Sequence, residues 1–241
     1  MRPSPRAVAA LFTLAALIGA ASVATAQVRY GVVKQQRGKA GKWKAAIAYP
    51  QFRDRGNVAR LANRSIRAWS EGRLDAFQRF GNRSIAEGAE APGPLELDVK
   101  PFVSYAGSGL ISTYFTVFKY EGGAHPNTDF QAHNYGLLRF RAKRLKLQDL
   151  FRSWHKGHET CSDLIIARLK KNPRAARVAE GSVTSLPKDV TERFVITRGS
   201  LTFLIPAYVV ASYADGPFIV KIPYSDFEGK LNPAGPLKGL I

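Results

Sequence analysis

The spacing of apolar residues predicts one long amphipathic helix in the first third of the chain. Over residues 54–81, apolar side chains recur every three or four positions, as on one face of an α-helix. The residues of this face are Val58, Leu61, Ala62, Ile66, Trp69, Ala76 and Phe80. The opposite face carries an arginine stripe, formed by Arg53, Arg60, Arg64 and Arg67. Such a stripe is either a solubilising surface or a surface that binds anions.

Most of the remaining chain shows the two-residue alternation of β-strands, interrupted by turn residues. The predicted strands are residues 28–33, 44–49, 95–105, 110–120, 130–142, 194–197, 200–205 and 218–222. A flexible basic stretch, residues 35–42, separates the first two. Glycine-bearing turns join the next three, which indicates an antiparallel meander. A second helix is predicted over residues 161–171.

These elements predict an α+β fold, in which an antiparallel meander is packed by the long helix and by the second helix. The Pro/Gly break near Pro92 is expected to divide a small N-terminal strand-helix lobe, residues 27–91, from a larger C-terminal lobe, residues 92–241. In the third meander strand an apolar row alternates with a cationic row. The apolar row is Leu138, Phe140 and Ala142, and the cationic row is Arg139, Arg141 and Lys143.

The N-terminus has the pattern of an export signal. Arg2 and Arg6 precede an uncharged, mostly apolar run over residues 7–21, and small residues at 24–26 indicate cleavage before Gln27. Cleavage would leave 241 − 26 = 215 residues. The alternative is a retained membrane anchor, although the run is shorter than the ~20 residues that span a bilayer. We therefore expect a periplasmic or secreted protein.

Composition indicates a folded, strongly basic chain. The apolar fraction is 45%, and 36 Lys and Arg face 18 Asp and Glu, a formal charge of +18 that becomes 34 − 18 = +16 after signal cleavage. Residues 27–95 carry 14 − 5 = +9 of this excess. Outside the cytoplasm, the polyanions that such a surface attracts are lipid head groups, lipopolysaccharide phosphates and wall polymers, and nucleic acid is not an expected partner. The single cysteine, Cys161, excludes a disulfide scaffold and is expected to be buried, with an intermolecular bridge as the alternative.

Two histidine groups have residue types that bind metals or transfer protons. His125 and His133 lie near Glu121 and Asp129, and His155, His158 and Cys161 follow at three-residue intervals. Gly122, Gly123, Ala124 and His125 form a loop motif in which the histidine is expected to hydrogen-bond the loop. A metal at either group remains the alternative. Because no nucleophile elbow, Walker loop or dinucleotide-binding glycine pattern occurs, we predict no catalytic residue, metal or cofactor.

Three stretches carry a family resemblance. They are Tyr120, Glu121, Gly122, Gly123, Ala124, His125 and Asn127; Leu145, Leu147, Asp149, Leu150 and Phe151; and residues 203–206 with Tyr208, Tyr213, Ala214, Gly216, Pro217, Ile222, Pro223 and Tyr224. Together they resemble the extracytoplasmic domain shared by the lysozyme-sensing anti-sigma factor RsiV and certain peptidoglycan deacetylases. The region with Tyr49, Pro50, Val58 and Ile66 is similar to the smaller domain that usually precedes it.

The resemblance implies an extracytoplasmic binding module. The family member with a defined role binds lysozyme and thereby exposes its membrane-anchored host to proteolysis. This chain differs, because a signal peptide stands in place of a sigma-binding segment and because a deacetylase domain has no room in it. Sigma-factor signalling and deacetylation are therefore not expected.

The leading hypothesis is a non-catalytic module that recognises an anionic envelope component. Its predicted ligand-binding residues are Arg60, Arg64, Arg67, Arg139, Arg141 and Lys143. One alternative is protein binding, including lysozyme inhibition, for which an acidic patch is needed because lysozymes of the animal type are basic. The candidate acids are Glu96, Asp98, Glu121 and Asp129. The other alternative is a cryptic cell-wall hydrolase.

Overall fold

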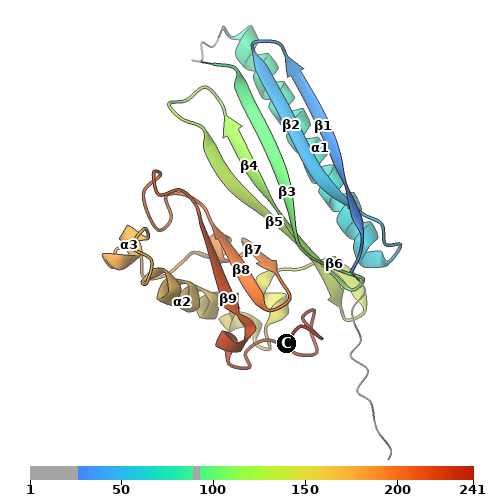
Figure 1. Ribbon diagram of the computed structural model, residues 1–241, viewed down its shortest axis with the longest axis vertical. Coiled ribbons are helices and arrows are strands. Elements are labelled where there is room, and N and C mark those ends of the chain that lie inside the picture. Colours follow the sequence, from blue (N-terminus) through green and yellow to red (C-terminus); the bar gives the residue numbers. More distant parts are fainter. Residues whose placement is uncertain (1–26, 89–92) are drawn as a thin grey trace, which may run out of the picture.

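The computed structural model describes residues 27–88 and 93–241, so the predicted signal segment and the predicted lobe boundary at residues 91 and 92 lie outside the described residues. Its larger part is a six-stranded sheet, whose strands follow one another in chain order (Figure 1). The strands are β1 (Tyr30–Lys39), β2 (Trp43–Phe52), β3 (Leu95–Gly107), β4 (Leu110–Tyr120), β5 (Asn127–Leu138) and β6 (Arg141–Arg144). Neighbouring strands are antiparallel except β2 and β3, which pair in parallel across the predicted boundary.

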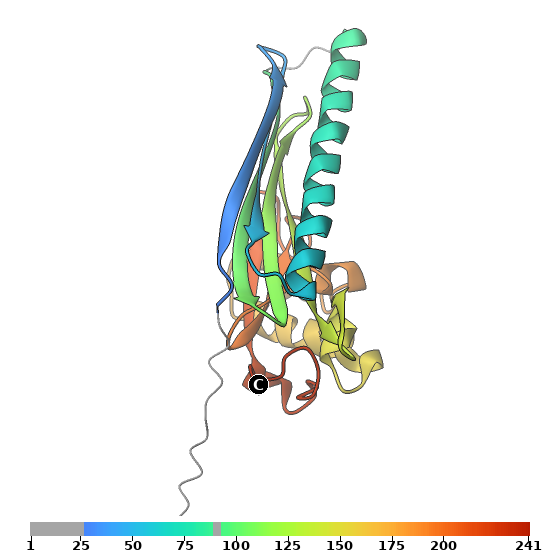
Figure 2. The same cartoon turned by 90° about the vertical axis from the view of Figure 1, so that its right-hand side faces the viewer.

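One long helix, α1 (Asn57–Ala86), connects the parallel strands β2 and β3 and covers one face of the sheet (Figure 2). Its buried residues are Val58, Ala59, Ala62, Ile66, Ser70, Leu74, Phe77 and Gly81. The buried face is therefore rotated from the predicted one, since Leu74 and Phe77 are buried whereas Ala76 is not. The cause is the partner surface: Trp43 of β2 packs edge-on to Phe77, which turns this side of the helix to the sheet.

The smaller part follows β6 and contains a three-stranded antiparallel sheet. Its strands are β7 (Phe194–Ile196), β8 (Ser200–Ile205) and β9 (Phe218–Pro223), and they confirm the predicted hairpin and last strand. The helices around it are η1 (Leu147–Leu150), η2 (Trp154–Lys156), α2 (Gly157–Leu169), α3 (Ala176–Ala179), α4 (Lys188–Thr191) and η3 (Tyr224–Phe227). A large apolar core fills the space between this sheet, α2 and the end of the chain.

A buried polar bridge fixes the small sheet to the large one. The Ser112 hydroxyl of β4 donates to Asn134 Oδ1 of β5 at 2.6 Å and accepts from the Ile196 backbone N–H of β7 at 2.8 Å. The Asn134 amide donates to the Phe194 carbonyl at 2.8 Å. Because both side chains are buried and bonded to the small sheet, the register of β7 against β4 and β5 is set by these bonds.

The α+β class is therefore confirmed, with two corrections to the strands. Residues 35–39 belong to β1 and are not a flexible stretch, because Gln35 to Lys39 pair with β2 from Ile47 to Trp43. The third meander strand ends at Leu138 and does not continue to Ala142. In the part of the chain that the structure describes, no helix has both the length and the apolar character needed to span a membrane.

Candidate binding cleft

The chain reverses at Arg139 and Phe140, where a continuous strand was predicted. Leu138 pairs with Arg141, so Arg139 and Phe140 form a two-residue β-hairpin turn between β5 and β6. Both have positive φ, 48° and 63°, in the left-handed region that suits Asn and Gly and that bulky residues rarely adopt. The predicted buried position of Phe140 is therefore wrong: the residue is 98% exposed at the tip of the hairpin.

Beside this hairpin lies a cleft of about 1230 Å³. The walls are the β3–β4 turn, the β5–β6 hairpin, the η1 region and the C-terminal tail. Its apolar lining includes Leu110, Leu137, Phe140, Pro236 and Leu240. The same cleft contains all three cations of the predicted strand row, Arg139, Arg141 and Lys143, together with Lys238 from the tail.

The three predicted cations differ in how their charge is used. Lys143 Nζ lies 3.1 Å from Asp149 Oδ1, and the other carboxylate oxygen of Asp149 accepts the Lys146 backbone N–H at 2.8 Å. Lys143 is therefore engaged in holding η1 to the hairpin. Arg139 and Arg141 are exposed, and within the described residues neither side chain makes a hydrogen bond or ion pair. These two arginines are the cations of the predicted row that remain available to a ligand.

The part of the predicted arginine stripe that lies on α1, here called the helix stripe, lines a second, shallower depression of about 470 Å³, whereas Arg53 precedes the helix. Arg60, Arg64 and Arg67 are all exposed there, and Glu71 is the acidic residue in the lining. Asn63 fixes the helix beneath them by exchanging two hydrogen bonds with the Phe52 backbone, at 2.8 and 2.9 Å. Because β6 packs against α1, the N-terminal half of the helix and the hairpin lie at the same end of the molecule (Figures 1 and 2).

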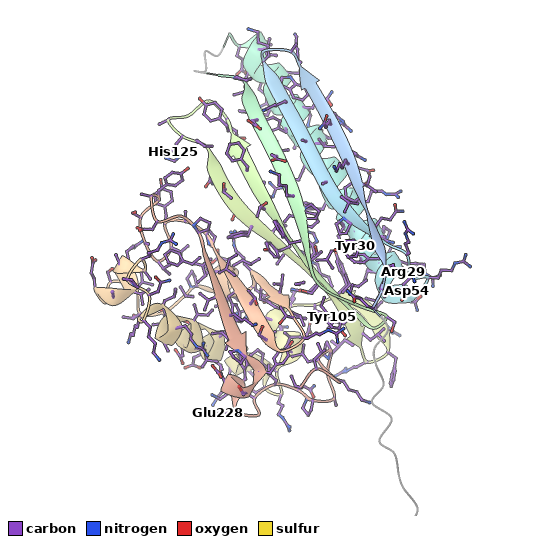
Figure 3. All side chains as sticks on the ribbon, in the orientation of Figure 1. Arg29, Tyr30, Asp54, Tyr105, His125 and Glu228 are labelled. Atoms are coloured by element: carbon purple, nitrogen blue, oxygen red, sulfur yellow. The ribbon has the colours of Figure 1, made fainter. Side chains whose placement is uncertain are left out.

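The loop motif Gly122, Gly123, Ala124 and His125 lies at the other end of the sheet, opposite a loop of the smaller part (Figure 3). The His125 ring contacts the Pro126 carbonyl oxygen at 3.0 Å through Nδ1, so the predicted hydrogen bond within the loop is confirmed. The ring also stacks on Tyr213, with 4.1 Å between centroids, and Nε2 lies 3.4 Å from the Tyr208 hydroxyl. Sequence reasoning missed this contact, because 83 residues separate His125 from Tyr208.

The structure keeps His125 and His133 apart, since one lies on an exposed loop and the other is buried. His133 is buried between α1 and the sheet, 5.1 Å from the Trp69 ring, and its Nδ1 lies 3.0 Å from the Tyr135 hydroxyl. Burial, assisted by Arg144 and Arg73, lowers the pKa of His133 to about 3. The His133 ring is therefore neutral at neutral pH.

His158 and Cys161 are also used in packing. His158 Nδ1 lies 2.7 Å from the Thr191 hydroxyl and its Nε2 lies 3.3 Å from Glu192, and burial lowers the pKa of His158 despite that carboxylate. Cys161 is fully buried as predicted, and burial raises the pKa of its thiol. Among the residues described, no group of three His, Cys, Asp or Glu side chains is placed to hold a metal ion.

The four acidic residues considered for a lysozyme-binding patch are each paired with a cation. The pairs are Glu96 with Lys44 at 3.0 Å, Asp98 with Lys100 at 2.8 Å, Glu121 with Lys119 at 2.7 Å, and Asp129 with Arg193. Their negative charge is thus compensated locally, which leaves little field to attract a basic protein.

Comparison with known proteins finds a family match for one region within the C-terminal half of the chain. Residues 148–225 match the family model described as "Protein of unknown function (DUF3298)". No curated protein sequence matches the chain. Among solved structures, a DUF3298 family protein from Pseudomonas aeruginosa PAO1 is 19% identical, with a TM-score of 0.61 over 90% of this chain and 98% of that one.

A second solved structure gives the same result. A member of the DUF3298 family from Bacteroides fragilis NCTC 9343 is 19% identical, with a TM-score of 0.54 over 86% of this chain and 95% of that one. Both alignments extend through the six-stranded sheet as well as the matched region, because each covers most of the chain. The chain therefore contains a region that matches the DUF3298 family, within a fold that it shares with two proteins of that family.

Proposed function

We propose that the chain is an exported, non-catalytic binding module that recognises an anionic component of the cell envelope. The observation that supports this most is the cleft at the β5–β6 hairpin, where the unpaired Arg139 and Arg141 lie beside an apolar lining in the described part of the chain. Guanidinium groups suit phosphate, because their planar donors bind two oxygens at once. The chemistry of the cleft thus fits a ligand with phosphate or carboxylate groups next to apolar surface.

The helix stripe extends this positive surface. Arg60, Arg64 and Arg67 lie on the half of α1 that is nearest the hairpin, so both groups of cations act at the same end of the molecule. Fields of clustered charges concentrate polyanions, and they weaken as salt shortens the Debye length from about 10 Å at 0.1 M to about 3 Å at 1 M. Affinity that depends on these arginines is therefore expected to fall as salt rises.

The export signal in residues 1–26 determines which anions the protein would meet. In the periplasm or the medium these are phosphorylated lipid head groups, lipopolysaccharide and anionic wall polymers. Lysozyme binding, the role that the RsiV resemblance implies, has weaker support, because the mature charge of +16 repels a basic protein and the candidate acids are paired.

The proposal is tested with the mature chain, residues 27–241, and two anionic probes. One is inorganic polyphosphate, and the other is phosphatidylcholine vesicles that contain 30 mol% phosphatidylglycerol. We expect binding to at least one probe at 50 mM salt, weakened at 500 mM salt, and reduced in the variant R64Q/R67Q. The matched control is K170Q/K171Q, which removes the same charge from exposed positions after α2. No binding to either probe, or equal loss in both variants, would contradict the proposal.

A further inference from the structure

We infer that the tip of the β5–β6 hairpin inserts into the surface of an anionic lipid membrane, with Phe140 as the apolar anchor and Arg139 and Arg141 as phosphate contacts. This inference rests on the proposed function and names the ligand as a lipid surface. The first observation is the exposure of Phe140, which is 98% exposed and so contributes little to packing the fold. A phenylalanine in that position gains free energy only when something covers it.

The second observation is the backbone that presents this side chain. Arg139 and Phe140 are consecutive non-glycine residues at positive φ, in a turn for which Asn-Gly is the favoured pair. Holding two such residues in the left-handed region costs stability, and strain of this kind concentrates at functional sites. Since Phe140 gives the fold no packing in return, the turn is better explained by what the tip contacts.

The third observation is the charge around the anchor. Arg139 precedes Phe140 in the turn and Arg141 follows it at the start of β6, and both guanidinium groups are free of partners within the described residues. An aromatic residue between arginines is suited to the boundary between head groups and acyl chains, where the ring enters the apolar layer and the cations stay with the phosphates. Leu137, 42% exposed on the same hairpin, adds apolar surface next to the tip.

Direct insertion is measured by placing a reporter at the anchor. In F140W, the tryptophan emission is compared with that of the wild-type chain, which has the same three other tryptophans. With phosphatidylcholine vesicles containing 30 mol% phosphatidylglycerol, we expect the added emission to shift to shorter wavelength and to be quenched by lipids brominated on the acyl chain. Vesicles of phosphatidylcholine alone should give neither effect, because they lack the negative charge.

Partitioning of further variants tests the two components separately. F140S should bind the anionic vesicles about tenfold more weakly, and R139Q/R141Q about thirtyfold more weakly, since each cation adds to attraction by an anionic surface. The controls are I219S, which removes another exposed apolar side chain, on β9, and K170Q/K171Q. Both controls should bind as the wild type does. The melting temperature of each variant is measured to check that its fold is intact.

The outcomes separate this inference from the proposed function. If the chain binds the anionic vesicles but the F140W emission is neither shifted nor quenched, insertion is wrong while anion binding stands. Binding to polyphosphate without binding to vesicles likewise overturns insertion and leaves anion binding intact. If the chain binds neither probe, the proposed function itself fails. Binding that F140S weakens no more than I219S does would also overturn the anchor role of Phe140.

Discussion

Replacing the hairpin turn by its favoured sequence should stabilise the protein and weaken its binding. The double variant R139N/F140G puts Asn-Gly where the structure has φ values of 48° and 63°. A left-handed conformation costs an ordinary L-residue about 1–2 kcal/mol, and glycine does not incur this cost. Glycine instead adds about 0.5–1 kcal/mol of unfolded-state entropy. The loss of Phe140 removes almost no packing, because the residue is 98% exposed.

The net effect is a gain in unfolding free energy of about 1 kcal/mol, which for a domain of this size raises the melting temperature by about 2–4 °C. Calorimetry or denaturant unfolding measures the gain, and binding to vesicles with phosphatidylglycerol measures the loss, expected to exceed tenfold. A lower melting temperature would show that the turn is not strained or that Phe140 packs on the fold. Unchanged binding would show that the natural turn is not retained for the membrane contact.

Three further predictions concern stability and reactivity. Gly72→Ala should stabilise α1 by about 0.5–1 kcal/mol, because the added Cβ would meet nothing within 4 Å. Gly81→Ala should destabilise the chain by about 1–3 kcal/mol, because the added Cβ would lie 2.6 Å from the Trp43 side chain. Thermal unfolding of the two variants checks both signs. In the folded chain the pKa of His133 is about 3, against 6.5 in the unfolded chain, so the unfolding free energy should fall as pH decreases below about 6.5. At pH 4.5 the wild-type chain should have lost about 2–3 kcal/mol more than the variant His133→Gln, as measured by urea unfolding at each pH. Cys161 should resist a thiol reagent until the chain unfolds, because it is buried and its thiol pKa is raised; rapid labelling of the native chain would refute this.

The spacing of apolar residues predicted most of the strands and helices, but it failed where contacts between distant segments determine the structure. The strands of the meander and the hairpin of the small sheet follow from alternation and glycine-bearing turns. The parallel pairing of β2 with β3 was missed because alternation reveals neither the direction nor the partner of a strand, although the helix between them is the usual connection of a parallel pair. The rotation of α1 was missed for the same reason, since the large ring of Trp43 and the small Gly81 fit together across 38 residues.

For the candidate site, the sequence predicted which residues take part but not how they are arranged. Charge and alternation directed attention to Arg139, Arg141 and Lys143, and all three line the cleft. Alternation alone placed them on a continuous strand, because neither Arg139 nor Phe140 is a residue type that signals a turn. The pairing of Lys143 with Asp149 was equally invisible, since it depends on where the chain folds back after β6. Neighbouring residues were thus predicted as one row, although within the described residues two of the cations are free and one is structural.

The magnitudes of the tip contacts limit how this module would act at a membrane. Two arginines near an anionic surface contribute about 1 kcal/mol each, and partial burial of one phenylalanine contributes about 1.5 kcal/mol. The total of about 3.5 kcal/mol corresponds to a binding constant on the order of several hundred per molar, well below the ~10⁴ M⁻¹ of a single myristoyl chain. The hairpin alone would therefore give only transient contact. Residence at the membrane would require Arg60, Arg64 and Arg67 at the same end of the molecule to add their attraction, so the tip and the helix stripe should each be necessary and neither sufficient.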